Sequence, residues 1–151
     1  MAFDITTTAE TLQTAMRALQ DADGHDVFFA VDIATPKNGR PQGPYAVIHP
    51  GSISVIETTL KNTVQRHVLR VEVHVSPTAV SNQERALLGA RIASQVLEAL
   101  CGDFTLGGSV RNVDITGLAV EFADREIDDV PSRVAEITVP LIVDGTQDFT
   151  A

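Results

Sequence analysis

The chain has 151 residues, of which 44% are hydrophobic, and this is the size and apolar content of one globular domain. Its net charge of −9 argues against a nucleic-acid-binding surface. No apolar run approaches the roughly 20 residues that a membrane-spanning helix needs. A single cysteine, Cys101, excludes an intrachain disulfide and a multi-cysteine metal site.

The charge is spread unevenly along the chain. Residues 1–34 hold six acids and one arginine, residues 35–102 hold four acids and seven bases, and residues 103–151 hold ten acids and three arginines. One interpretation is ordinary solvated faces. The other is a protein with one basic and one acidic side, which a stacking or ring-forming protein would use.

A first helix is predicted from Thr7 to about residue 20. Thr7 suits the N-cap, because Glu10 stands three residues later and can reach back to the cap. Leu12, Met16 and Leu19 then fall on one helical face. The turn residues Asp21–Gly24 are expected to end the helix.

Two strands are predicted next. Val27–Ala34 alternates apolar and smaller or polar residues, and Tyr45–His49 forms a second, short strand. The proline- and glycine-rich residues 35–44 between them predict a hairpin with a long, exposed, flexible loop. Pro50-Gly51 is expected to break the chain again, and the polar residues 57–66 are expected to form a second flexible loop.

The clearest strand and helix follow. Arg66–Val75 places Leu69, Val71 and Val73 on one face. A helix over residues 81–101 is predicted to start at a capping box of Ser81 and Glu84. Its apolar stripe is expected to contain Ala86, Ala90, Ala93, Leu97 and Leu100, with Leu88, Ile92 and Val96 beside it.

The remaining strands are predicted at residues 110–115, 118–123 and 134–143. Pro140 lacks a backbone N–H, so the last strand is expected to end or lie at a sheet edge there. The predicted fold is one α+β domain over residues 1–151, with a mostly antiparallel sheet and two helices (about 7–20 and 81–101) packed on one face.

No catalytic, cofactor-binding or metal site is predicted. Gly102–Gly108 lacks the Gly-Lys of a phosphate loop, and Cys101 is expected to be a buried small hydrophobe. Arg70, Glu72 and His74 share one face of their strand, where a solvated surface is favoured over an acid–base or metal site. The acid-rich residues 124–129 are expected to form a solvated turn.

The order of elements resembles the tail terminator proteins of long-tailed bacteriophages, also called tail completion or head-to-tail joining proteins. The resemblance is carried by four segments in sequence. They are Tyr45–Gly51, Arg66–Val75 after a polar stretch, the amphipathic helix Asn82–Leu100, and the closing strand Ala135–Val143. It covers roughly residues 7 to 144 and includes no invariant catalytic signature.

The resemblance implies a structural virion protein without enzymatic activity or cofactor. Proteins of this family form a homo-hexameric ring at the head-proximal end of the tail, which stops growth of the tail tube and docks on the head connector. DNA passes through the ring without specific binding, and no membrane is involved. Such a protein is assembled in the host cytoplasm and resides in the neck of the virion.

Two sets of residues become candidates for this role. An acidic lumen would repel DNA phosphates, so we expect some of Glu121, Asp124, Glu126, Asp128 and Asp129 to line it. The two predicted loops carry Lys37, Arg40, Lys61 and Arg66, which we expect to contact ring neighbours or partners. Alternatives are a head-closure or minor tail protein, a non-viral small binding module, and an enzyme using Glu72 and His74.

Overall fold

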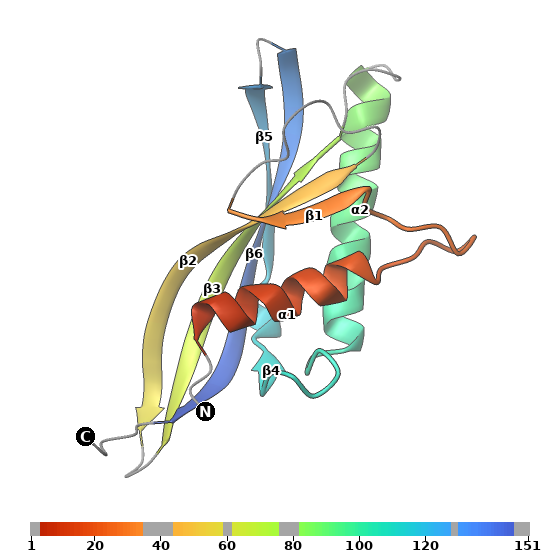
Figure 1. Ribbon diagram of the computed structural model, residues 1–151. Helices are drawn as coiled ribbons and strands as arrows, with labels where there is room; N and C mark the ends of the chain where they lie inside the picture. Colours follow the sequence, from red (N-terminus) through yellow and green to blue (C-terminus); the bar gives the residue numbers. More distant parts are fainter. Residues whose placement is uncertain (1–3, 35–43, 59–61, 76–81, 128–129, 147–151) are drawn as a thin grey trace.

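The fold is α+β, with two helices and a six-stranded, mostly antiparallel sheet (Figure 1). The computed structural model describes residues 4–34, 44–58, 62–75, 82–127 and 130–146. The elements in chain order are α1 (Ile5–Arg17), β1 (Ala30–Ile33), β2 (Tyr45–Thr58), β3 (Asn62–His74), α2 (Asn82–Gly102), β4 (Asn112–Val113), the 3-10 helix η1 (Ile115–Gly117), β5 (Ala119–Ile127) and β6 (Val130–Thr146).

Three long strands form the centre of the sheet. β3 pairs antiparallel with β2 on one side and with β6 on the other. The strand order is β1-β2-β3-β6-β4, and β5 also pairs with β6. β4 and β5 therefore follow one another along the same side of β6, with η1 between them.

One face of this sheet holds the core. Leu69, Val71 and Val73 of β3 are fully buried, as are Ile137 and Val139 of β6. Burying each such side chain stabilises the fold by roughly 1.5–3 kcal/mol relative to leaving it in water. Residues from both helices belong to the same buried cluster, namely Ala9, Leu12 and Met16 of α1 and Ile92, Ala93, Val96 and Leu100 of α2. Both helices therefore pack on this face, as the alternation predicted.

α1 begins two residues earlier than the sequence predicted. The N-cap is Asp4 rather than Thr7, and the Asp4 carboxylate accepts a hydrogen bond of 2.8 Å from the Thr7 backbone N–H. This bond lowers the pKa of Asp4, because it stabilises the charged carboxylate. An aspartate is at least as good a cap as a threonine, so the helix starts from the earlier residue. The helix ends at Arg17, and Gly24 takes the positive φ of 79° in the turn that follows.

α2 confirms the predicted long helix. Ile92, Ala93, Val96 and Leu100 form its buried stripe, while Arg91 and Glu98 are exposed. A Cβ atom at Gly89 would lie 3.7 Å from Cγ2 of Val75, so the helix packs close to β3. Ser81 of the predicted capping box lies outside the described residues.

The predicted hairpin of the first two strands is wrong. β1 is shorter than predicted and pairs with β2 in parallel, with Ala30 beside Tyr45 and Ile33 beside Ile48. A parallel pair cannot be closed by a tight turn. The predicted loop residues 35–43 lie outside the described residues.

β2 does not break at Pro50-Gly51 but continues to Thr58. The register with β3 shifts between Pro50 and Ser52, which leaves Gly51 as the extra residue of a bulge. Ile48 accepts a hydrogen bond from Ala34 on the β1 side, so by alternation Pro50 also faces that side. β1 has ended there, and the missing N–H therefore removes no ladder hydrogen bond.

The second predicted loop is also largely strand. Glu57 and Thr58 belong to β2 and residues 62–66 belong to β3, so the polar segment is the end of a long antiparallel pair. Only residues 59–61 of that segment lie outside the described part of the chain. Polar composition misled the prediction because Glu57, Thr58 and Asn62 are exposed at the end of the pair, where no apolar alternation is needed.

Pro140 neither ends β6 nor lies at the outer edge of the sheet. Its carbonyl accepts a hydrogen bond of 2.9 Å from the Asp114 backbone N–H, so residue 140 faces the side of β4 and β5. η1 interrupts the ladder between those two strands at this point. The proline is therefore accommodated at a local gap within an otherwise paired strand.

A buried histidine connects α1 to the sheet. His67 on β3 is 0% exposed, and its Nδ1 lies 2.7 Å from the Thr8 hydroxyl while its Nε2 lies 2.8 Å from Oε1 of Gln65. Burial lowers the pKa of His67, because the charged imidazolium loses its hydration, and the carboxylate of Asp4 opposes this only in part. The folded chain therefore binds a proton at His67 less readily than the unfolded chain does.

No helix among the described residues is both long and apolar enough to cross a bilayer.

We predict that Gly51→Ala destabilises the fold by about 1–3 kcal/mol, because a Cβ atom at this bulge would lie 2.7 Å from the backbone oxygen of Val68. Gly102→Ala is the matched control, since a Cβ atom there meets nothing within 4 Å. Urea unfolding of both variants measures the difference. Equal free energies of unfolding for the two variants would contradict the proposed close approach.

We also predict that the free energy of unfolding falls as the pH is lowered below about 6.5. The folded-state pKa of His67 lies below that of the unfolded chain, so the unfolded state binds the proton first. The stability is fully present above the unfolded pKa and is lost at up to about 1.4 kcal/mol per pH unit as the pH falls. His67→Leu should flatten this slope between pH 7 and 5, although the variant is less stable throughout.

His25→Gln is the control for this experiment, because the His25 side chain is 78% exposed. Denaturant unfolding at several pH values should give it the wild-type slope. If His67→Leu also keeps the wild-type slope, the buried histidine is not the group that titrates.

Candidate functional site

The face of the sheet that points away from the helices carries a row of carboxylates. The strand register places Asp32 beside Val47, Val47 opposite Glu72, Glu72 opposite Glu136, and Glu136 opposite Glu121. Directly opposite residues share a face, so four carboxylates cross five strands in one line. Like charges in this position disfavour the folded chain. The row therefore suits a surface that meets positive groups or repels negative ones.

Two histidines stand around the glutamate at the centre of this row. Glu72 Oε2 lies 3.3 Å from Nε2 of His74, and Glu72 Oε1 lies 3.9 Å from Nε2 of His49. The Tyr45 ring stacks on the His74 ring with 4.6 Å between centroids and 6° between planes. Arg70 on the same face is exposed. The cluster joins side chains of β2 and β3 on the face of the sheet that points away from the helices.

The predicted trio of Arg70, Glu72 and His74 does share a face, but it is not simply a solvated one. The His74 side chain is only 9% exposed and that of Glu72 is 20% exposed. His49, which joins from the neighbouring strand, was not predicted to belong to this group. The strand register was the missing information, because it places His49 directly opposite Arg70.

The predicted acidic residues lie mostly along one edge strand. Glu121 and Asp124 are exposed on β5, and Glu126 belongs to the same strand. The expected solvated turn at residues 124–129 is wrong, because β5 continues to Ile127 and pairs with β6 up to Val130. Asp128 and Asp129 lie outside the described residues. Whether these acids line a lumen stays a prediction.

Of the four basic residues predicted to make contacts, only Arg66 lies among the described residues. Lys37, Arg40 and Lys61 lie outside the described residues. Arg66 lies in β3, and its Nε is 3.3 Å from Oδ2 of Asp114. Both side chains are about one third exposed, so this ion pair contributes no more than about 1 kcal/mol. The contact of Arg66 with a ring neighbour or partner stays a prediction, and such a contact would compete with the ion pair between Arg66 and Asp114.

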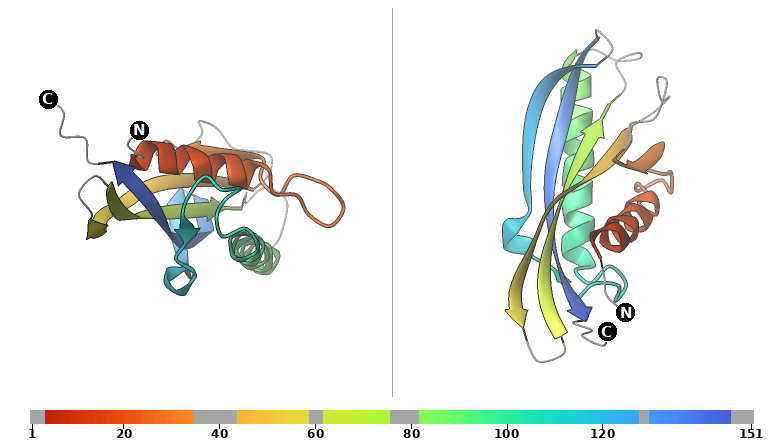
Figure 2. Two further views of the ribbon diagram at one scale, coloured as in Figure 1. Left: turned by 90° about the horizontal axis from the view of Figure 1, so that it is seen from below. Right: turned by 60° about the vertical axis from the view of Figure 1, so that its left-hand side comes forward.

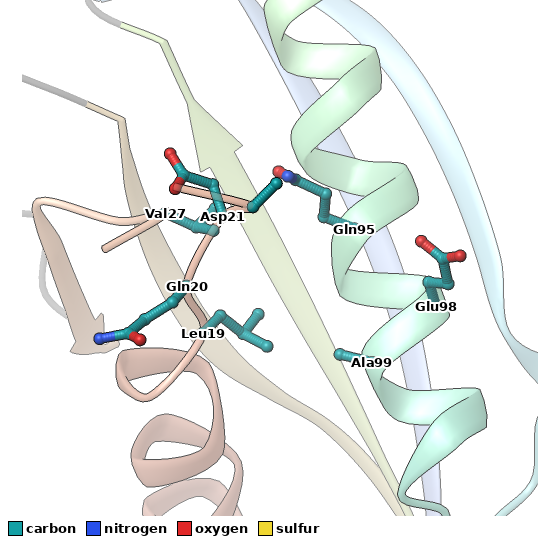
Figure 3. Close-up of a pocket in the computed structure, with 8 residues that line it drawn as sticks. Leu19, Gln20, Asp21, Val27, Gln95, Glu98 and Ala99 are labelled. Carbon is teal, nitrogen blue, oxygen red and sulfur yellow. The ribbon is translucent and has the colours of Figure 1, made fainter. Parts of the chain in front are cut away.

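A groove runs between α2 and the segment that connects α1 to β1 (Figure 3). It encloses about 310 Å³ and is lined by Leu19, Gln20, Asp21, Ala22, Val27, Gln95, Glu98 and Ala99. A second groove of about 310 Å³ lies between α1 and the 103–109 segment, and a third of about 290 Å³ lies by Phe29 and Asp32. The Glu72 cluster lines none of these three grooves.

Asp21 at this groove is engaged by its own turn. Its Oδ1 accepts hydrogen bonds from the backbone N–H groups of His25 and Asp23, and these bonds lower the pKa of the Asp21 carboxyl. Ligand atoms of Asp21, Asp23 and His25 lie within 4.8 Å of one another, which is the one metal-compatible group among the described residues. Asp23 and His25 are exposed, and the polar turn accounts for the arrangement.

In the glycine-rich segment after α2, backbone N–H groups donate hydrogen bonds to side chains of the same segment. The Gly107 N–H donates to Oδ1 of Asp103 at 3.1 Å, and the Gly108 N–H donates to the Thr105 hydroxyl at 3.2 Å. A phosphate loop needs such groups directed at the ligand. Cys101 was expected to be buried and is exposed, because it lies one position past the buried stripe that ends at Leu100.

The fold is similar to that of a solved sheath/tube terminator of an extracellular contractile injection system, the PVC particle in its extended state. The TM-score is 0.51 at 13% sequence identity, and the likeness covers 98% of this chain. The chain spans about 60% of the length of that terminator. At this identity the likeness establishes a shared fold.

A second solved structure covers 100% of this chain and 99% of its own, at 16% identity and a TM-score of 0.47, which is too weak to carry an argument. No protein-family model matches the sequence, and no curated protein matches it.

We predict that Glu121→Thr raises the free energy of unfolding by about 0.2–1 kcal/mol. The change removes a like charge directly opposite Glu136 and introduces a β-branched residue that favours strands. Thermal and urea unfolding at low and high salt measure the gain, which should shrink as salt screens the repulsion. A loss of stability at low salt would show that repulsion along the carboxylate row is negligible.

Proposed function

We propose that this chain is a tail terminator, a structural protein that forms a ring at the head-proximal end of a phage tail or a related contractile particle. The ring stops polymerisation of the tail tube and offers the surface on which the head, or its counterpart, is joined. The observation that carries this proposal is the fold shared with a sheath/tube terminator over 98% of the chain. The order of segments in the sequence supports the same assignment.

The described surface is consistent with an assembly role. The carboxylate row through Glu72 and Glu136 lies on a sheet face, and the exposed end of β2 lies at a sheet edge. Interfaces between structural subunits use such surfaces, whereas enzymes bring convergent polar groups into concave pockets. The proposal therefore assigns the chain no catalytic activity and no cofactor, and it gives the Glu72 cluster no catalytic role.

The proposed partners follow from the proposed position. Copies of the same chain would form a hexamer, the tube protein would lie on one side, and a head completion or connector protein on the other. DNA would pass through the lumen without specific binding, past acids such as Glu121 and Asp124 that repel phosphate. Lys37, Arg40, Lys61 and Arg66 would contact neighbours or partners.

We predict that the purified chain caps tubes assembled from the tube protein of its own particle. Adding it at one hexamer for every few tube rings should shorten the tubes, because a capped end no longer accepts subunits. Electron microscopy should show an extra ring at one end of each tube, and native mass spectrometry should give six copies in that ring. The matched control is an equal amount of heat-unfolded chain.

Tubes of unchanged length without an added ring would overturn the terminator assignment. A head-closure protein would bind isolated connectors and leave tube length unchanged. A minor tail protein would appear along or inside the tubes, and a non-viral binding module would associate with neither.

A further inference from the structure

The second half of β2 is exposed and forms a free edge of the described sheet. β1 covers only Tyr45–Ile48, and beyond that point β2 pairs with β3 alone among the described strands. The nine consecutive residues Pro50–Thr58 are all exposed. We call this stretch the β2 edge. None of the described strands lies beside Gly51–Glu57 on the side away from β3, and such an edge is a template for another chain.

The β2 edge is apolar where an edge strand is normally polar. Ile53, Val55 and Ile56 are 54%, 57% and 53% exposed. Ile53 lies opposite His67 and Val55 opposite Gln65, whose own neighbours on β6, Leu141 and Val143, are in the core. Ile53 and Val55 therefore project from the helix-bearing face. Proteins protect such edges with lysine, proline or a covering segment.

β5 is a second free edge on the other side of the sheet. It has nine residues and pairs with β6 alone among the described strands. Phe122 on this strand is 45% exposed, and it lies opposite the buried Ala135, so it also projects from the helix-bearing face. The free ends of β2 and β5 lie at opposite ends of the molecule (Figures 1 and 2).

We propose that the β2 edge of one copy of this chain pairs with the β5 edge of a second copy, so that the sheet continues from subunit to subunit. The inference deepens the proposed function and rests on the ring that it requires. A contact between two different edges is head-to-tail, and such contacts close into rings when the rotation between neighbours allows it. Two identical edges would instead stop at a dimer.

The apolar side chains of the two edges match in this arrangement. β2 and β5 run in opposite directions within one copy, so an antiparallel pairing of the two edges keeps the helices of both copies on the same side. Ile53 and Val55 of one copy and Phe122 of the next then project from the same face and bury one another at the junction. Each is about half exposed in the single chain. Burial of these three side chains supplies the apolar centre that a stable interface needs.

The occupant that fits this edge is a second copy of the chain. The β2 edge and the β5 edge both expose apolar side chains on the helix-bearing face, and both border a single strand among the described strands. Two copies therefore supply both halves of an apolar junction.

The first test is the double variant Ile53→Lys with Val55→Lys, measured by sedimentation and native mass spectrometry. Lysines in place of apolar edge residues should weaken self-association by about tenfold or more. Both side chains are more than half exposed, so circular dichroism should show an unchanged fold. The control is Leu87→Lys on α2, which makes the same kind of change at a residue 57% exposed and should associate like the wild type.

The second test distinguishes head-to-tail pairing from pairing of like edges. Phe122→Lys should also be monomeric when it is alone. Mixed with the β2-edge double variant, it should form a one-to-one heterodimer, because each partner then contributes one intact edge. This recovery also shows that both variants are folded.

The proposal is overturned if the β2-edge variant associates like the wild type, or if Leu87→Lys loses association to the same degree. It is also overturned if Phe122→Lys alone still associates while the β2-edge variant is monomeric, since two β2 edges would then be paired. A wild-type chain that stays monomeric overturns it too. Rings that persist in the edge variants leave the proposed function intact, and tube capping tests that function separately.

Discussion

The structure depends on the apolar alternation of β3 between two long antiparallel neighbours. Leu69, Val71 and Val73 are fully buried on one face, and β6 continues that face with Ile137 and Val139. A sheet with one apolar face must be covered on that face only, and two helices provide the cover. α1 and α2 contribute to a single buried cluster with these strands. The strands are longer than the region that the helices cover, so their ends remain open.

The opposite face is free to carry polar chemistry because the core does not need it. Glu72, Arg70 and His74 alternate with the buried residues of β3, and the strand register extends the same line to Glu136 and Glu121. His67 is the exception, a polar residue on the helix-bearing face that is fully buried. Its contact with Thr8 joins the first turn of α1 to β3, and its burial there lowers the pKa of the imidazole.

Much of the fold was predictable because strong periodicity has a local cause. The α+β class, the long helix α2 and the buried face of β3 follow from residues that are close in sequence. The continuation of β2 through Pro50-Gly51 was not predictable in this way. Proline and glycine usually break a strand. They are tolerated here because β3 accommodates a bulge and β1 has already ended, and both features depend on residues that are distant in sequence. The parallel pairing of β1 with β2 likewise depends on tertiary structure and not on local sequence.

The candidate surface was predictable only in its parts. Sequence alternation places Arg70, Glu72 and His74 on one face, but it does not show that His49 lies beside them or that Glu136 and Glu121 extend the row. Regional charge counts showed a basic middle and an acidic end without showing their geometry.

The strand register shows where these charged residues lie on the sheet. It sets Arg70 toward the β2 side of the sheet and Glu121 on the β5 side. The carboxylate row itself crosses the whole sheet, from Asp32 on β1 through Glu72 and Glu136 to Glu121 on β5. Glu72 at the centre of the row lies between His49 of β2 and His74 of β3, so the chemistry of this face depends on residues that only the strand pairing brings together.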